Sequence, residues 1–172
     1  MRLSRSESTP QAGPKDTILR LRAGVKKSVY VCSSSIEWFW VHWEGRRSAP
    51  CTEPHEECRG HKLQLPRRCK GYLNVYCLDD RRYCYVELTP TCGEQFDRHY
   101  GKGANLRGAR FSLQRGQGDK AHLYLEFQEA MSDTRQLKPG TSVERVLRSL
   151  WKLSEDVQEE MPMEEVDING QI

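Results

Sequence analysis

The sequence predicts a mainly β fold: a small barrel with a long inserted loop, one short inserted helix and a C-terminal helix. Two pairs of short segments alternate apolar and polar residues around a turn, which is typical of β-hairpins. They are residues 72–78 with 82–88, and 110–114 with 122–127. Residues 28–32 and 36–43 are rich in β-branched and aromatic side chains, which favour strands.

The segment 17–23 is also predicted to be a strand, because its residues alternate in character. Leu19 and Leu21 fall on one face, and Arg20 and Arg22 fall on the other.

The 72–88 hairpin has a predicted register. With Asp80 and Arg81 in the turn, apolar residues pair on one face, and three tyrosines occupy the other. The apolar pairs are Cys77 with Cys84, Val75 with Val86, and Leu73 with Leu88, and the tyrosines are Tyr76, Tyr83 and Tyr85.

A short helix over 89–100, with Pro90 in its first turn, is expected to separate the two hairpins. A Gly-rich basic loop, 101–109, follows it. Further on, Thr141 and Glu144 form a capping box for a helix that runs to about residue 153.

This order of elements suits a barrel of the oligonucleotide-binding (OB) type, and it also suits other small β-barrels. The predicted organisation has four parts. They are a disordered basic arm (1–15), an OB-like barrel (16–130) with a metal loop at 44–70, a linker and C-terminal helix (131–153), and a disordered acidic tail (154–172).

Composition narrows the class of protein. Only 37% of the 172 residues are hydrophobic and 30% are charged, so the core is expected to be modest. No apolar run approaches the roughly 20 residues that cross a bilayer, and the N-terminus lacks the apolar stretch of a secretory signal. A cytoplasmic protein without a membrane partner is expected, in which cysteines serve as metal ligands or buried thiols rather than disulfides.

Charge is distributed unevenly along the chain. Residues 154–172 hold seven acidic residues and no Lys or Arg, so the remainder has 27 basic and 17 acidic residues. The body therefore carries about +10, which favours an anionic partner.

Cys51, His55 and Cys58 lie within a stretch of eight residues, inside a segment (44–70) that shows no periodicity. Thiolate and imidazole ligands at such short spacings are typical of tetrahedral zinc. A segment this long also needs something other than a core to order it. A structural zinc is predicted here, with His42 as the fourth ligand.

Other residues compete for that fourth position or have a different role. Cys69 and His61 are the alternatives to His42. Cys77, Cys84 and Cys92 fall on apolar faces and are expected to be buried thiols.

Signatures of catalysis are missing from the sequence. No HExxH or deaminase pattern occurs, and the Gly-rich segment 101–108 lacks the Gly-Lys-Ser/Thr ending of a P-loop. A protein without enzymatic activity is expected.

Basic and aromatic residues occur together around the loop and the hairpins. Proteins that bind single strands combine a cationic groove with rings on which bases stack. The residues predicted to contact nucleic acid are Arg46, Arg47, Arg67, Arg68, Lys70, Tyr76, Tyr83, Tyr85, Arg107 and Arg110. Trp38, Trp40 and Trp43 are further candidates for stacking, although Trp38 and Trp40 share a face, which favours core packing for these two.

The combination resembles the zinc-containing single-stranded DNA-binding proteins of phages. The resemblance depends on the His42, Cys51, His55 and Cys58 loop, the basic and aromatic barrel segments, and the acidic end 154–172. It implies a bacterial or phage-encoded OB-fold protein that acts in replication, recombination or mobile-element processes. Its acidic tail would recruit a replication or recombination protein. The ligand set departs from that family, because a His replaces one thiolate.

A second hypothesis is a zinc-ribbon adaptor subunit. Its basic face would then bind a protein or a structured RNA within a nucleoprotein complex.

Overall fold

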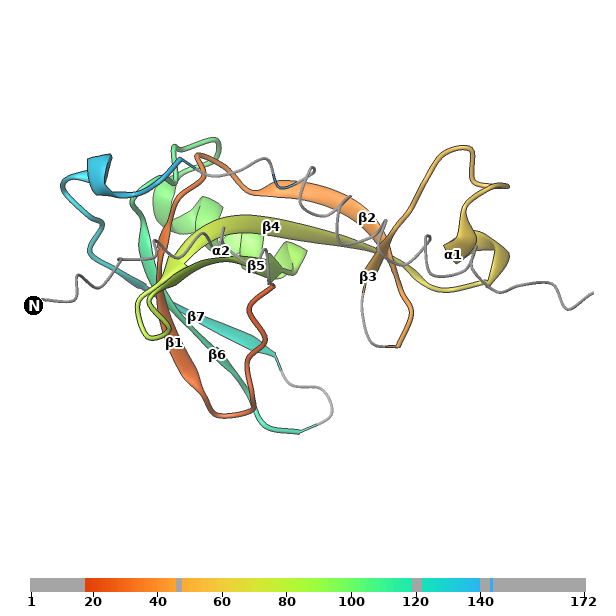
Figure 1. Cartoon of the computed structure of the whole chain (residues 1–172), viewed down its shortest axis with the longest axis horizontal. Helices are drawn as coiled ribbons and strands as arrows, with labels where there is room; N and C mark the ends of the chain where they lie inside the picture. Colours follow the sequence, from red (N-terminus) through yellow and green to blue (C-terminus); the bar gives the residue numbers. More distant parts are fainter. Residues whose placement is uncertain (1–17, 46–47, 119–121, 140–142, 144–172) are drawn as a thin grey trace, which may run out of the picture.

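The computed structural model describes residues 18–45, 48–118, 122–139 and 143, and these form one antiparallel sheet of seven strands (Figure 1). The strands are β1 (Lys26–Val31), β2 (Glu37–Trp43), β3 (Ser48–Pro50), β4 (Arg67–Cys77), β5 (Arg82–Leu88), β6 (Arg110–Arg115) and β7 (Leu123–Gln128). The helices are α1 (Arg59–Lys62), α2 (Pro90–Tyr100) and a 3-10 turn, η1 (Thr134–Gln136).

The strands follow the order β3-β2-β4-β1-β6-β7, and β5 pairs with β4. The described strands form an open sheet rather than a closed barrel. The predicted fold class, mainly β with a helix between two hairpins, is confirmed.

Strand β4 connects two parts of the molecule. Residues 71–77 pair with β5 on one edge, and the end of this stretch pairs with β1 on the other edge. Residues 67–70 have only β2 as a neighbour among the described strands. Together with β2, β3 and α1 they form an extension of the sheet, hereafter the arm (Figure 1).

The main core lies between the sheet and α2. Phe96 of α2 packs edge-on against Phe111 and Phe127, with ring centroids 5.1 and 5.0 Å apart. Cys77, Cys84 and Cys92 are buried in this cluster, which confirms their prediction as buried thiols. Burial raises the pKa of the Cys84 thiol to about 12, so it stays protonated and unreactive.

The β4–β5 hairpin differs in register from the prediction by two residues. Cys77 pairs with Arg82 and Val75 with Cys84, so four residues, 78–81, form the connection. Asp79 accepts a hydrogen bond from the Ser28 backbone at 2.7 Å, and Asp80 pairs with Lys27. These contacts to β1 hold both aspartates outside the strand pairing. A two-residue shift leaves each side chain on its predicted face.

Two segments differ from their predicted secondary structure. Residues 17–23 are not a strand where they are described: Ile18 bridges Tyr85 and Ala23 bridges Arg115, each at a single point. The segment crosses from β5 to the end of β6 and so cannot pair along either. Residues 44–70 were expected to be a loop, but they contain β3, α1 and the first residues of β4.

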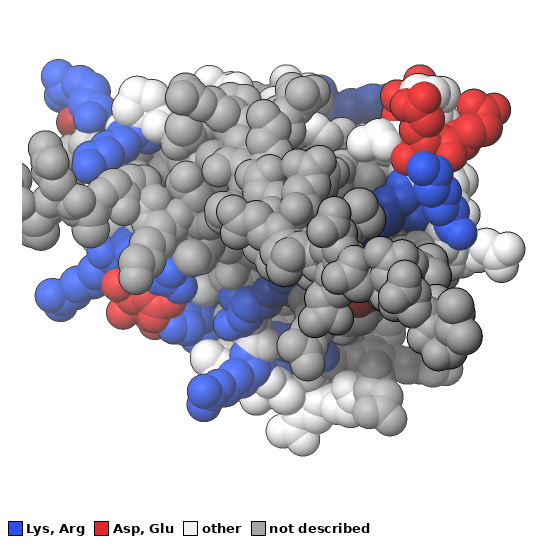
Figure 2. All heavy atoms as spheres, turned by 45° about the vertical axis from the view of Figure 1, so that its right-hand side comes forward, with Lys and Arg blue, Asp and Glu red and all other residues white. Residues whose placement is uncertain are grey.

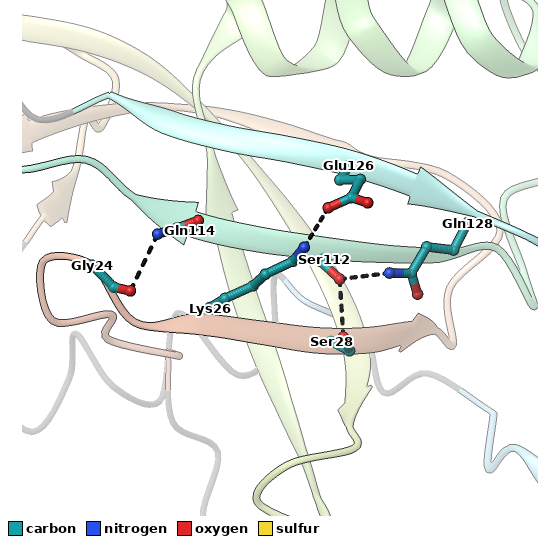
Figure 3. A network of polar contacts seen from close by, with 7 residues as sticks. All are labelled: Gly24, Lys26, Ser28, Ser112, Gln114, Glu126 and Gln128. Atoms are coloured by element: carbon teal, nitrogen blue, oxygen red, sulfur yellow. Dashed lines mark hydrogen bonds and ion pairs between the residues drawn. The ribbon is translucent and has the colours of Figure 1, made fainter.

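Polar side chains connect β1, β6 and β7 on the face away from the core (Figure 3). The Ser28 and Ser112 hydroxyls lie 2.9 Å apart, and the Gln128 amide donates to Ser112 at 2.8 Å. Lys26 forms an ion pair with Glu126. This side of the sheet is therefore occupied by its own cross-strand contacts.

The predicted N-terminal arm, capping box, C-terminal helix and acidic tail lie outside the described residues, except for Val143. None of the described helices has the length and apolarity that a membrane span requires.

Candidate metal centre

Four side chains meet at the far end of the arm. His42 comes from β2, Cys51 follows β3, Cys58 precedes α1 and His61 lies within α1. Their ligand atoms all lie within 4.8 Å of one another. Cys58 Sγ lies 3.6 Å from His42 Nε2, and Cys51 Sγ lies 3.9 Å from His61 Nδ1.

The orientation of His42 suits metal binding. Its ring is buried, and its Nδ1 lies 3.0 Å from the Leu65 carbonyl oxygen. Since a carbonyl only accepts, Nδ1 carries the proton and Nε2 offers its lone pair toward the Cys58 sulfur. A backbone carbonyl that fixes the tautomer in this way is typical of metal-ligating histidines.

The two thiols have different electrostatic surroundings. Burial raises the pKa of Cys58, but hydrogen bonds from the His61 side chain and the Thr52 backbone outweigh it and lower the pKa to about 5. Burial and the neighbouring Cys58 raise the pKa of Cys51, and Arg67 acts in the opposite direction. Cys58 is thus a thiolate at neutral pH, which is the form that binds a metal.

The structure brings together three of the four predicted ligands: His42, Cys51 and Cys58. His55 is not among them, because its side chain is 45% exposed and stacks on His61 with ring centroids 4.3 Å apart. His61, a predicted alternative for the fourth position, occupies that place instead.

Sequence spacing alone does not distinguish His61 from His55 as a ligand. His55 and His61 are both three residues from Cys58. Cys58 is the N-cap of α1, so the first helical turn carries the residue three positions later back toward the thiol. No apolar periodicity marks this short helix. Cys69, the other alternative, lies opposite Trp40 in the sheet and outside the cluster.

Of the tyrosines predicted to stack on bases, Tyr85 is buried, and Tyr76 and Tyr83 are half-buried and contact other protein groups. Tyr85 is only 2% exposed and forms a second apolar cluster with Tyr72 and Val143. Tyr76 and Tyr83 pack edge-on at 5.0 Å, and Tyr83 Oη accepts a hydrogen bond from the Lys138 backbone at 3.1 Å. The residues that follow η1 approach this face, which was expected to be open.

The predicted cationic residues have mixed roles. Arg107 donates to the carbonyls of Cys32 and Leu137, each at 2.7 Å, and so serves the fold. The Arg110 guanidinium lies 5.5 Å from the centroid of Tyr30, and Lys70 lies 3.6 Å from a Glu87 carboxylate oxygen. Arg46 and Arg47 lie outside the described residues.

Arg67 and Arg68 are both exposed on the arm, and Arg67 lies next to an aromatic ring. Its guanidinium carbon is 4.2 Å from the centroid of Trp40. Because neighbouring residues of a strand point to opposite faces, Arg67 and Arg68 lie on opposite sides of the arm.

Trp38 and Trp40 differ from the core packing expected for them. They are 41% and 50% exposed, on the side of the sheet that α2 covers elsewhere. Trp38 contacts helix α2, because a Cβ on Gly93 of that helix would lie 2.5 Å from the indole ring. Trp40 lies farther along the arm, beyond the helix. Alternation showed that the two share a face but not how far α2 reaches.

Comparison with known proteins adds no family to this description. Neither a family model, nor a curated protein, nor a solved structure matches the chain.

Proposed function

We propose that this chain is a non-catalytic single-stranded DNA-binding protein whose arm is stabilised by a structural zinc ion. The observation that carries the proposal is the pair of exposed indoles, Trp38 and Trp40, with the Arg67 guanidinium over the second. We call these three residues the stacking platform.

The stacking platform has the chemistry of a single-strand site. Rings with an exposed face accept any base, and each stack contributes about 1–3 kcal/mol. An arginine over an indole adds a planar cation that can itself stack or contact a phosphate. Three residues on one face of two paired strands form a continuous surface, since Trp40 pairs with Cys69 and His42 with Arg67.

Zinc is the metal that best fits the ligand set. Two thiols and two imidazoles without a carboxylate favour tetrahedral zinc over magnesium or calcium. Sulfur and nitrogen at about 2.0–2.3 Å from one ion lie about 3.3–3.8 Å apart. The 3.6 Å between Cys58 Sγ and His42 Nε2 is within that range. With four protein ligands the site is closed, which supports a structural role.

The His/Cys cluster and the stacking platform are in contact. Arg67 pairs with His42 in the sheet, and it acts on Cys51 both by charge and by a hydrogen bond to the thiol. One guanidinium thus serves a ligand of the cluster and the Trp40 ring together. Ordering the metal loop therefore holds one side of the stacking platform in place.

Fluorescence titration tests the proposal. Unstructured DNA should quench the tryptophan emission, and affinity should fall as salt rises from about 50 to about 200 mM. Trp40→Ala and Trp38→Ala should each weaken binding by roughly 1–3 kcal/mol. Val25→Ala, an exposed apolar residue away from the arm, is the matched control and should bind normally.

Duplex DNA and RNA of the same sequence complete the experiment. Full affinity in both tryptophan variants would exclude the stacking platform as the site. Absence of binding to any oligonucleotide at low salt would refute the function itself and favour an adaptor that contacts another protein.

A further inference from the structure

A second concave surface lies at the edge of β4 that no described strand covers. It has a volume of about 770 Å³ between the arm, residues 18–21, the N-terminal half of α2, the end of β6 and the start of β7. We call it the basic cleft. Its size is within the range of clefts that hold ligands.

Positive charge dominates the lining of the basic cleft. Among the described residues that line it, four are Lys or Arg and one, Glu87, is a carboxylate. The four cations are Arg20, Arg68, Lys70 and Arg115. Figure 2 shows Lys and Arg side chains at several places on the face that includes the arm, and Asp and Glu side chains in a few small groups.

Glu87 is already engaged by protein groups. Its carboxylate accepts hydrogen bonds from the Tyr72 hydroxyl at 2.9 Å and the Ser48 hydroxyl at 3.4 Å. Lys70 lies 3.6 Å from its other oxygen and balances its charge. Arg20, Arg68 and Arg115 therefore remain as a positive surface on which a polyanion would bind.

Two aromatic rings add a second kind of contact. Trp43 is 37% exposed and Tyr124 is 62% exposed, and both line the basic cleft. Cations next to exposed rings provide what a nucleic-acid strand presents, namely phosphates and flat bases.

The groove beside the stacking platform has the opposite charge. Trp38 borders a groove of about 480 Å³ that Glu94 and Asp97 also line. Phosphates would be repelled there, although bases could still stack on the indoles. A strand on the stacking platform therefore needs another surface for its backbone.

The basic cleft and the stacking platform meet at the free edge of β4. Arg67 belongs to the stacking platform and Arg68 to the basic cleft, and they are consecutive residues on opposite faces. A strand that passes around this edge would contact both surfaces.

We propose that the basic cleft binds the phosphate backbone of the same single strand whose bases stack on Trp38 and Trp40. The proposal rests on the proposed function and adds the route of the strand. It assigns phosphate contacts to Arg20 and Arg115 and base contacts to Trp43 and Tyr124. A free nucleotide shares this chemistry, but the three remaining arginines exceed what one phosphate group needs.

The test uses the full chain with the double substitution Arg20→Gln and Arg115→Gln. Each lost phosphate contact should reduce the slope of log affinity against log salt by about 0.7, so the double variant should lose about 1.4. Its affinity for an oligonucleotide of about 16 nucleotides should fall at least about tenfold at low salt. The matched control is Arg22→Gln with Arg135→Gln, two exposed arginines outside the basic cleft, and it should keep the wild-type slope.

Two further measurements distinguish failure of this proposal from failure of the proposed function. Arg20→Lys with Arg115→Lys should restore the slope, which excludes a folding defect. An oligonucleotide of about 4 nucleotides should bind the wild type and the Gln variant alike, because it covers only the stacking platform.

If the salt slope of the Gln variant is unchanged and Trp40→Ala still weakens binding, the proposed route of the strand through the basic cleft is wrong. Competition by a mononucleotide at the same concentration as the long oligonucleotide would overturn the strand as occupant. Normal binding in both Trp40→Ala and the Gln variant would exclude the stacking platform as well, whereas absence of binding by the wild type would refute the proposed function.

Discussion

Gly60 lies directly against the imidazole ring of His42. A Cβ at Gly60 would lie 2.2 Å from the His42 Cδ2 atom, so no other residue fits without moving the ring. The helix that carries His61 thus approaches β2 closely enough for the two histidines to share one centre.

Gly60→Ala should therefore displace His42 and weaken zinc binding by at least about tenfold, as loss of a supporting contact does in other metal sites. Competition with a chromophoric chelator measures the affinity. Leu63→Ala, at the exposed end of the same helix, is the control and should bind zinc normally. Equal affinity in the two variants would show that the ring does not need this close approach.

His61→Ala and His55→Ala should differ in metal content. His61 belongs to the cluster, and His55 stacks outside it, so only the first substitution removes a ligand. Metal analysis should give about one equivalent of zinc for the wild type and His55→Ala, and much less for His61→Ala. The reverse result would restore the ligand set expected from spacing.

Removal of zinc should weaken single-strand binding, because Arg67 contacts both Cys51 and Trp40. The expected loss is roughly fivefold or more, and DNA should raise zinc affinity by the same factor. Titrations with and without a chelator measure it. In Trp40→Ala the chelator should reduce the affinity for DNA by a smaller factor than in the wild type. An identical reduction would mean that zinc does not act through the contact between Arg67 and Trp40.

Arg107→Ala should destabilise the fold rather than the complex. Its guanidinium donates to carbonyls of Cys32 and Leu137, and without it these acceptors lose a charged partner. Thermal or urea unfolding should show a loss of about 2–3 kcal/mol. Below the unfolding transition, affinity for DNA should equal that of the wild type. A stable variant with weak binding would instead place Arg107 in the interface.

Asp80→Asn tests the connection between β4 and β5. The hydrogen bond from Lys27 lowers the pKa of Asp80 below its ordinary value of 3.8. Ionised Asp80 therefore stabilises the fold above pH 3.8, and this contribution disappears as the pH falls through the lowered pKa.

The variant should melt below the wild type near neutral pH, and the difference should shrink toward about pH 3. Asp97→Asn, an exposed carboxylate on α2, is the control. A constant difference across this range would contradict a role for the charge.

Local sequence patterns predict the strands and helices well, but they predict poorly which surfaces are exposed to solvent. Alternation placed Val75, Val86 and Phe111 in the core, and Pro90 marked the first turn of α2. The tyrosines of the first hairpin were assigned to the correct face, but that face packs against residues distant in sequence, such as Val143. Alternation identifies which residues share a face, and only tertiary structure decides whether anything covers it.

The candidate metal site shows the same limit in a shorter segment. Cys51 and Cys58 follow from residue type and spacing, whereas the choice between His55 and His61 depends on one helical turn. Arg20 and Arg115 carry no motif at all. They meet at the basic cleft because residues 18–24 cross from β5 to β6, a route that the sequence does not encode locally.

The continuity of β4 has a consequence for how the molecule opens. Its residues 73–77 are almost entirely buried and most have a neighbour strand on each side, whereas 67–70 are more exposed and have one neighbour among the described strands. Segments with few buried contacts open with lower free energy than the whole protein does. We therefore expect the arm to unfold and refold as a cooperative unit on a rigid base, and an ion bound at its tip would hold it closed. Amide protons of β2 near Trp40 should then exchange at a rate set by metal occupancy, while those of β1 and the end of β4 report global stability.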